Sequence, residues 1–178
     1  DELVFDGGSL VFDGGGRLVV RGPQFVEEVR VVDLDLAPRA GTEPLRVVPV
    51  TGPRPVDAPA HAPEVVPPLG RADEVYRALV LGTHDYVTKN GFGDVVIGLS
   101  GGIDSTLVAA IAADALGPER VHGVLMPSRY SSDHSVSDAE ALAAALGIEH
   151  RIIPIEDAHK GFEAMLAESF AGREPDLT

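Results

Sequence analysis

The 178-residue chain contains no cysteine and comparatively few basic residues. Without cysteine it can form no disulfide, no thiolate metal site and no cysteine nucleophile, so nothing in the sequence indicates an oxidising compartment. Acidic residues number 28 against 14 basic ones, and a formal net charge of −14 argues against a general affinity for nucleic-acid phosphates. We expect no nucleic-acid partner, and any phosphate-bearing ligand must be bound locally.

Long apolar runs are also missing. Stretches such as LAAALGI are far shorter than the roughly 20 residues that span a membrane, and no basic start followed by an apolar segment marks a signal peptide. We therefore expect a cytoplasmic protein with no membrane partner. Since 44% of the residues are hydrophobic, the chain could still bury a substantial core.

Composition divides the chain into three parts, of which the first two contain no helical pattern. Residues 1–36 show short β-type runs between Asp-Gly and Gly-Gly turns and predict a β-meander. Residues 37–68 carry nine prolines and predict an extended linker. The strands of the meander are expected at Leu3–Phe5, Ser9–Phe12, Arg17–Val20 and Val29–Leu34.

From residue 69 to residue 178 helical and strand patterns alternate, which predicts an α/β fold with a doubly wound parallel sheet. Helices are expected at about 71–90, 104–116, 135–146 and 157–171, and strands at Val95–Leu99, Val121–Met126 and Arg151–Pro154. The chain begins with Asp rather than Met and stops after a helix, where a three-stranded sheet still has open edges. We therefore expect an internal piece of a longer polypeptide.

The stretch GDVVIGLSGGIDSTLVAA leads from the first of these strands into a helix. Its β-branched run is typical of a strand covered on both faces. Gly101 and Gly102 let the backbone approach a ligand closely, and the N–H groups of the first helical turn should point beyond the carboxyl end of the strand. A phosphate-bearing ligand fits there, with hydroxyl groups from Ser100 and Ser105. Asp104 could cap the helix or bind a magnesium ion that bridges the phosphates.

The same residues would also fit a plain tight turn with Asp104 or Ser105 as an ordinary helix N-cap. The commonest phosphate loop, GxxxxGK[ST], uses its lysine on the β- and γ-phosphates during γ-phosphoryl transfer. This chain has no lysine between Lys89 and Lys160. A loop that holds phosphates by backbone and hydroxyl groups suits a reaction at the α-phosphorus, in which pyrophosphate leaves as a unit.

SGGIDS after a hydrophobic strand resembles the SGGxDS loop of the N-type ATP pyrophosphatases, which adenylate a carboxylate or carbonyl oxygen and then admit a nitrogen or sulfur nucleophile. The flanking segments LGTHDYVTKNGF and MPSRYSSDHS are similar to those of glutamine-dependent NAD synthetases. The opening DELVFDGGSLVFDGGGRLVVRGPQF resembles the last strands of the nitrilase-like glutaminase domain of that family. The resemblance covers nearly the whole chain, and the proline-rich linker is its least diagnostic part.

The resemblance implies a ligase that uses ATP and Mg²⁺ to adenylate the nicotinate carboxylate of deamido-NAD and then forms NAD with ammonia from glutamine. Residues 1–36 would end the glutaminase domain, and residues 69–178 would begin an ATP pyrophosphatase domain with an adenine nucleotide alpha hydrolase-like, Rossmann-like sheet. A homo-oligomer is also implied. Without a cysteine nucleophile the piece cannot hydrolyse glutamine, and we expect it to be inactive, or nearly so, in isolation.

The resemblance also assigns residues to roles. Leu125, Met126 and Ser128 would lie beside the adenosine, and Arg129 is a candidate nucleotide or substrate contact that could equally be a solvated or ion-paired arginine. Ser100 and Asp104 would be catalytic, with Asp104 as the magnesium ligand. The residues assigned to the pyrophosphate are Ser100, Gly101, Gly102, Ile103, Asp104 and Ser105.

Two alternatives remain open at this point. One is another N-type ATP pyrophosphatase with a different acceptor, such as a GMP synthetase or a thiolation enzyme. The other is a noncatalytic nucleotide-binding or assembly module.

Overall fold

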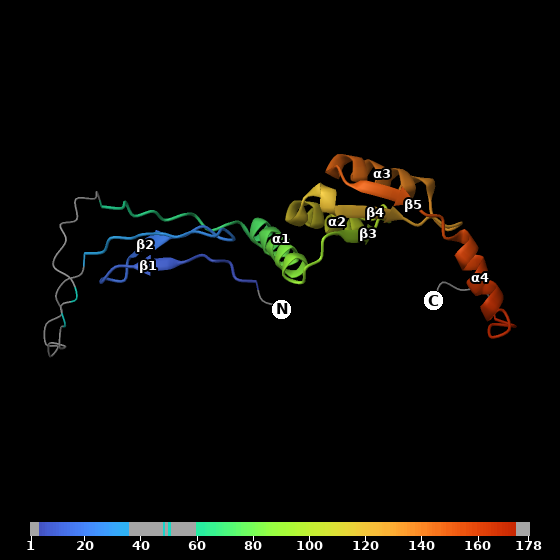
Figure 1. The fold of residues 1–178 in the computed structure, drawn as a ribbon, viewed down its shortest axis with the longest axis horizontal. Coiled ribbons are helices and arrows are strands. Elements are labelled where there is room, and N and C mark those ends of the chain that lie inside the picture. Colours follow the sequence, from blue (N-terminus) through green and yellow to red (C-terminus); the bar gives the residue numbers. More distant parts are fainter. Residues whose placement is uncertain (1–3, 36–47, 49, 51–59, 174–178) are drawn as a thin grey trace. The chain divides into compact units, whose positions relative to one another are not determined.

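The computed structural model describes residues 4–35, 48, 50 and 60–173, which are drawn in colour in Figure 1. These residues form two compact units, and the boundary between the units falls between Ala78 and Leu79, inside helix α1 (Arg71–Lys89). Within the described ranges every helix is too short or too polar to cross a membrane.

The first unit is built on a β-hairpin. Strand β1 (Leu10–Phe12) pairs in antiparallel orientation with β2 (Leu18–Arg21). The Asp13 carboxylate closes the turn by accepting hydrogen bonds from the backbone N–H groups of Gly15 at 3.0 Å and Arg17 at 2.9 Å. The N–H group of Arg17 is the main cause that lowers the pKa of Asp13 below its ordinary value. The Asp-Gly-Gly signal therefore does produce the predicted hairpin.

The other two predicted strands of this part, Leu3–Phe5 and Val29–Leu34, are wrong, because the described residues of both runs are irregular. A strand needs a partner for its backbone N–H and C=O groups, and local β propensity supplies none. The second run is attached to a later segment through a side chain instead. Its Asp33 Oδ2 accepts a hydrogen bond from the backbone N–H of His61 at 2.7 Å.

The end of the predicted linker lies along the hairpin. Arg21 N donates to Glu64 O at 3.0 Å and Val66 N donates to Arg21 O at 3.1 Å, which makes a parallel β-bridge. Nearly all of the remaining predicted linker lies outside the described residues. Residues 60–68, the end of the predicted linker, therefore belong to the first unit.

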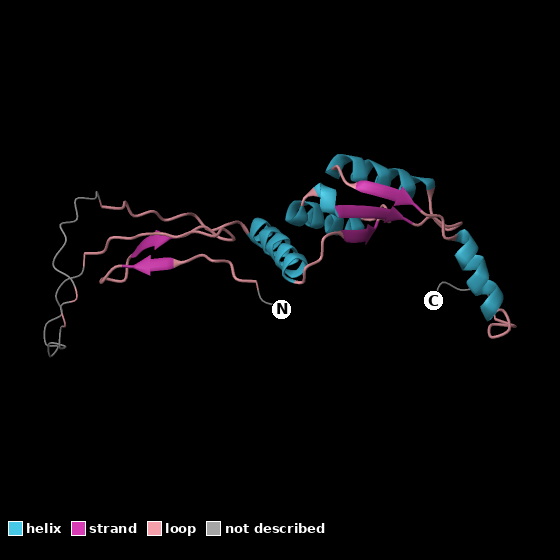
Figure 2. Cartoon of the chain, viewed as in Figure 1, coloured by secondary structure: helices cyan, strands magenta, loops and turns pink. Residues whose placement is uncertain are grey.

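The second unit is an α/β layer, and the predicted α/β fold with a parallel sheet is confirmed. Its three strands lie in the order β3-β4-β5, and Figure 2 shows them as arrows that point the same way. After α1 its elements are β3 (Val95–Gly98), α2 (Ile103–Leu116), a short 3₁₀ turn (Pro118–Arg120), β4 (Val121–Leu125), α3 (Asp133–Leu146), β5 (Glu149–Ile152) and α4 (Glu156–Leu166).

Most predicted boundaries in this unit agree with the structure to within two residues. The predicted strand Arg151–Pro154 is shifted, because β5 begins at Glu149, which pairs with His122 of β4. Beyond the strand, Ile153 N donates to Leu125 O at 2.8 Å and Ile155 N donates to Pro127 O at 3.1 Å, so the chain stays beside the end of β4 on both sides of Pro154. Helix α4 ends at Leu166 rather than at residue 171.

Helices α2 and α3 contact each other and pack on the same face of the sheet. Consecutive parallel strands joined by crossovers of one hand place both helices on one side. The expectation that the first strand is covered on both faces is wrong for the described residues, since Val96 is 70% exposed. The covered face holds the core, made of Val87, Leu99, Val121, Leu125, Ile148 and alanines of α2 and α3 such as Ala109, Ala139 and Ala143.

Candidate functional site

The loop between β3 and α2 is held in one shape by its own serines. Ser100 Oγ accepts a hydrogen bond from Gly102 N at 3.2 Å, and Ser105 Oγ accepts one from Ser100 N at 3.2 Å. Ser105 Oγ donates to Gly102 O at 3.1 Å, so the contact of 3.0 Å between the two hydroxyl oxygens is donated by Ser100. Three of the predicted loop residues, Ser100, Gly102 and Ser105, are therefore joined in one hydrogen-bond network.

Gly101 brings this loop directly against the first turn of α3. Its φ is +76°, in the left-handed region that favours glycine. A Cβ atom at this position would lie 2.3 Å from the carbonyl oxygen of Ser135 and 2.8 Å from its Cα. Only a residue without a side chain fits, so the close approach that the structure shows at Gly101 is to α3, and the predicted approach to a ligand stays a prediction.

Helix α2 begins immediately after the loop. Its N-cap residue is Gly102, and no side chain makes a capping hydrogen bond there. The alternative in which Asp104 or Ser105 is an ordinary N-cap is therefore wrong. The first N–H groups of a helix have no intrahelical acceptor, and together with the helix dipole they favour an anion at this position.

A cavity of about 240 Å³ opens beside the loop, where β3 and β4 end. It is smaller than the roughly 300–1,000 Å³ of pockets that hold whole drug-sized ligands, so it suits one part of a larger ligand. Its lining residues are Gly98, Leu99, Ser100, Leu125, Met126, Pro127, Ser131, Ser135 and Val136. Three residues predicted from sequence, Ser100, Leu125 and Met126, are thus brought together.

The two predicted apolar residues contribute differently to this cavity. Leu125 is only 2% exposed and belongs mainly to the core, whereas Met126 is 51% exposed. Of these two residues, Met126 therefore offers more free apolar surface. The lining residues Pro127, Ser131, Ser135 and Val136 were not predicted as site residues.

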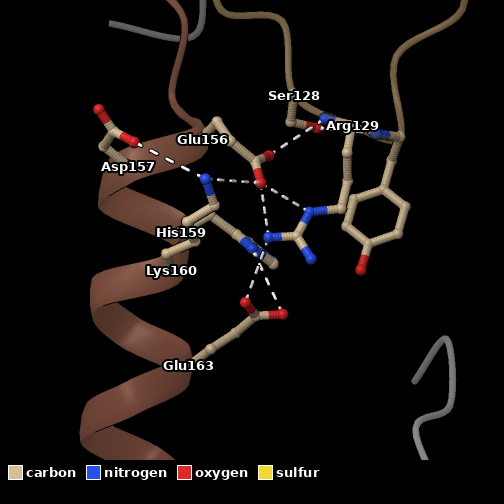
Figure 3. Close-up of polar contacts among 8 residues, drawn as sticks. Ser128, Arg129, Glu156, Asp157, His159, Lys160 and Glu163 are labelled. Atoms are coloured by element: carbon tan, nitrogen blue, oxygen red, sulfur yellow. Dashed lines mark hydrogen bonds and ion pairs between the residues drawn. The ribbon is translucent and has the colours of Figure 1, made fainter.

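Ser128 and Arg129 follow β4 but do not line the cavity. Ser128 shapes a turn, in which its N–H donates to Ser131 Oγ at 3.0 Å. Arg129 donates from Nε to Glu156 Oε1 at 2.8 Å and from Nη2 to Glu163 Oε2 at 3.3 Å. Figure 3 shows this guanidinium between the two carboxylates of α4, and the hydrogen bond to Glu156 is the main cause that raises the pKa of Arg129.

The start of α3 carries a signal that was present in the sequence. Ser132 is the N-cap residue, and its Oγ accepts a hydrogen bond from Ser135 N at 3.1 Å. Two serines three residues apart before a helical pattern predict such a cap. No local pattern, however, indicates that Ser135 lies against Gly101, which is 34 residues away.

Asp104 lies in the first turn of α2 with an exposed carboxylate. Within the described residues no group of three or more His, Cys, Asp or Glu side chains is arranged to hold a metal ion. An exposed carboxylate is an oxygen donor of the kind that Mg²⁺ prefers, and the role of Asp104 as a magnesium ligand stays a prediction.

The fold and the loop define a class: α/β proteins with a parallel sheet at whose carboxyl edge a glycine-rich turn leads into a helix, an arrangement that commonly holds phosphate groups. The family can also be stated. Residues 75–174 match the family model NAD synthase, and the chain belongs to that family.

The relatives confirm the resemblance read from the sequence. The glutamine-dependent NAD(+) synthetase of Thermotoga maritima is 50% identical over 191 residues, which cover 100% of this chain and 33% of the relative. That of Rhodobacter capsulatus is 44% identical over 178 residues, which cover 100% of this chain and 29% of the relative. The chain thus spans about a third of the length of these curated relatives.

Solved structures are also similar to the chain, and two of them are informative here. The glutamine-dependent NAD+ synthetase of Acinetobacter baumannii in complex with adenosine diphosphate has a TM-score of 0.79 and 35% identity, covering 99% of this chain and 30% of that one. The NMN synthetase of Francisella tularensis has a TM-score of 0.51 and 33% identity, covering 56% of this chain and 40% of that one.

Proposed function

We propose that the chain is part of a glutamine-dependent NAD synthetase, a ligase that converts deamido-NAD, ATP and glutamine-derived ammonia into NAD, AMP and pyrophosphate. One observation carries the proposal. Relatives with this name match the chain from end to end, including the part with the β-hairpin that precedes the family match at residues 75–174. Residues 1–36 then end the glutaminase domain, 37–68 link the domains, and 69–178 begin the synthetase domain.

The geometry supports an ATP site at the loop. Ser100 lines the cavity and is also hydrogen-bonded within the loop, so a ligand in the cavity continues directly toward the N-terminus of α2. We assign the adenosine to the part of the cavity at Leu125 and Met126, and to Ser128 in the turn that follows, which does not itself line the cavity. We assign the pyrophosphate part of ATP to Ser100, Gly101, Gly102, Ile103, Asp104 and Ser105. The A. baumannii relative, solved with adenosine diphosphate, supports a nucleotide here.

Ser100 and the first turn of α2 would act on the departing pyrophosphate. When the nicotinate carboxylate attacks the α-phosphorus, negative charge builds up on the oxygen that bridges to the β-phosphate. The N–H groups of Ile103 and Asp104 and the Ser100 hydroxyl, which would turn from Ser105 toward the phosphate, stabilise that charge. Mg²⁺ bound to the Asp104 carboxylate would supply further positive charge to the phosphates. Ammonia then attacks the adenylated carbonyl carbon, and AMP leaves.

The test uses the whole natural protein that carries this sequence. It is given ATP, Mg²⁺ and ammonium, and AMP is measured as deamido-NAD, xanthosine monophosphate, aspartate or citrulline is offered in turn. We expect AMP only with deamido-NAD. If AMP forms with another acceptor, the proposed ATP site stands and deamido-NAD is rejected as the substrate. If no acceptor yields AMP, a noncatalytic module is favoured.

Asp104→Ala tests the loop itself. Loss of a group that stabilises charge in the transition state should lower the rate of AMP formation by about 100- to 1,000-fold. Asp138→Ala, which removes an exposed carboxylate from α3, is the matched control and should leave the rate unchanged. Equal rates for the two variants would remove Asp104 from the mechanism.

The proposal also includes the location of the protein in the cell and its oligomeric state. An enzyme that consumes ATP and glutamine needs the cytoplasmic pools of both, so the protein would be cytoplasmic. The family resemblance favours a homo-oligomer. Light scattering by the whole natural protein measures its mass, and a monomer would reject that part of the proposal.

A further inference from the structure

The loop between β4 and α3 is fastened to α4 by contacts that nucleotide binding does not by itself require. Glu156 receives two hydrogen bonds from one residue: Arg129 Nε donates to its Oε1 at 2.8 Å and Arg129 N donates to its Oε2 at 3.3 Å. Glu163, two helical turns further along α4, accepts from Arg129 Nη2 at 3.3 Å. Figure 3 shows both carboxylates directed from α4 toward the guanidinium.

Neighbouring groups reinforce this connection. Ile155 N donates to Pro127 O at 3.1 Å, immediately before α4 begins. The rings of Tyr130 and His159 meet edge to face with centroids 5.7 Å apart. Arg129 above all lowers the pKa of Glu156, so the carboxylate is charged at neutral pH. The loop is therefore held to α4 by backbone, aromatic and charged contacts together.

Arg129 and Tyr130, which contact α4, lie in the chain between two residues of the cavity wall. Pro127 and Ser131 line the cavity, and Arg129 lies between them in the chain but does not line it. Two carboxylates surround its guanidinium, so its charge is already balanced. Arg129 is thus placed to hold the wall rather than to meet a phosphate.

We propose that Glu156 and Glu163 are positioning residues for the nucleotide: through Arg129 they hold residues 127–131 in place as the outer wall of the cavity. The proposal rests on the proposed function, because it assumes that a nucleotide occupies the cavity. The side chains of Arg129 and Glu156 are 41% and 29% exposed. Ion pairs this open to water contribute little each, so the effect on affinity should be modest and salt-dependent.

The experiment compares Glu156→Gln, Glu163→Gln and the double variant with Asp157→Asn in the whole natural protein. Asp157 is the matched control, since it is also an acid on α4 but is fully exposed, and its Oδ1 lies 3.9 Å from the Nζ of Lys160, which is also 3.8 Å from Glu156 Oε1. Calorimetry with ADP and stopped-flow kinetics give the Kd and the dissociation rate. We expect the double variant to weaken ADP binding about two- to tenfold, mainly through faster dissociation, and Asp157→Asn to change nothing.

Two further readouts separate positioning from a general loss of structure. In the double variant the KM for ATP should rise while kcat stays unchanged, and the backbone N–H of Ser131, which donates to Ser128 O at 3.0 Å, should exchange with deuterium faster. The reversed pair Arg129→Glu with Glu156→Arg should recover part of the affinity lost in Arg129→Glu alone.

Three results would overturn the proposal. The first is wild-type affinity in the double variant. The second is an equal loss in Asp157→Asn. The third is a loss in Arg129→Gln much larger than in the double variant, because that would place Arg129 on the nucleotide itself. A wild-type protein that binds no ADP or ATP would instead reject the proposed function, and this inference with it.

Discussion

Gly101→Ala tests the close contact between the predicted phosphate-binding loop and the first turn of α3. The new Cβ would lie 2.3, 2.8 and 2.9 Å from three backbone atoms of Ser135. Backbone atoms in the first turn of α3 cannot rotate out of the way, so either the loop or the helix must shift. Overpacking of this kind costs about 1–3 kcal/mol, and a non-glycine residue in the left-handed region costs about 1–2 kcal/mol more.

Gly147→Ala separates the two contributions. Gly147 follows α3 with φ +70°, and within the described part of the chain no atom beyond its two sequence neighbours lies within 4 Å of the position that a Cβ would take. Its replacement should therefore cost only the backbone term of about 1–2 kcal/mol. The difference between the two variants isolates the contact between Gly101 and Ser135.

The assay is calorimetric titration of the whole natural protein with ADP, together with hydrogen exchange at residues 99–105 and 133–136. We expect Gly147→Ala to bind ADP as the wild type does. If the strain from overpacking distorts the site, the Gly101→Ala variant should bind ADP about 10- to 100-fold more weakly. The backbone amide hydrogens of both segments should also exchange faster. Wild-type affinity in Gly101→Ala, or an equal loss in the two variants, would refute the reasoning.

Two further predictions concern the ion pair and the hairpin unit. Because Arg129 lowers the pKa of Glu156, the stabilisation from this pair is complete above the ordinary glutamate pKa of about 4.3 and is lost as the pH falls through the lowered folded value. The difference in thermal midpoint between the wild type and Glu156→Gln should thus stay constant from neutral pH down to about pH 5; a difference that closes above that pH would contradict the pairing. Gln24 Oε1 accepts a hydrogen bond from Leu69 N at 2.9 Å, and its Nε2 donates to Glu74 Oε1 at 3.2 Å. Gln24→Ala leaves the Leu69 N–H without this partner, so its hydrogen exchange should accelerate about fivefold, the equivalent of about 1 kcal/mol; an unchanged rate would show that Gln24 does not hold the start of α1.

Much of the second unit could be predicted, because its signals are local. Alternating strand and helix patterns, the glycines at 101 and 102 and the serine pattern before α3 all act within a few residues. The predictions failed where a β-type run needed a partner that lies far away in the sequence, either to pair with as a strand or to cover one of its faces. Val29–Leu34 has strong β propensity but finds no neighbouring strand among the described residues, and Val96 is exposed because both crossover helices lie on the other face.

The sequence by itself determined the alternating α/β pattern, the loop that can hold phosphates without a lysine, and the family. Only the tertiary structure decided which residues surround that loop. Ser135 lies against Gly101, and Arg129 is paired with Glu156 and Glu163, which are 27 and 34 residues away. Hydrogen-bond patterns and hydrophobic periodicity act over single turns and strands, whereas these contacts exist only after the crossovers bring the ends of neighbouring strands and helices to one edge of the sheet.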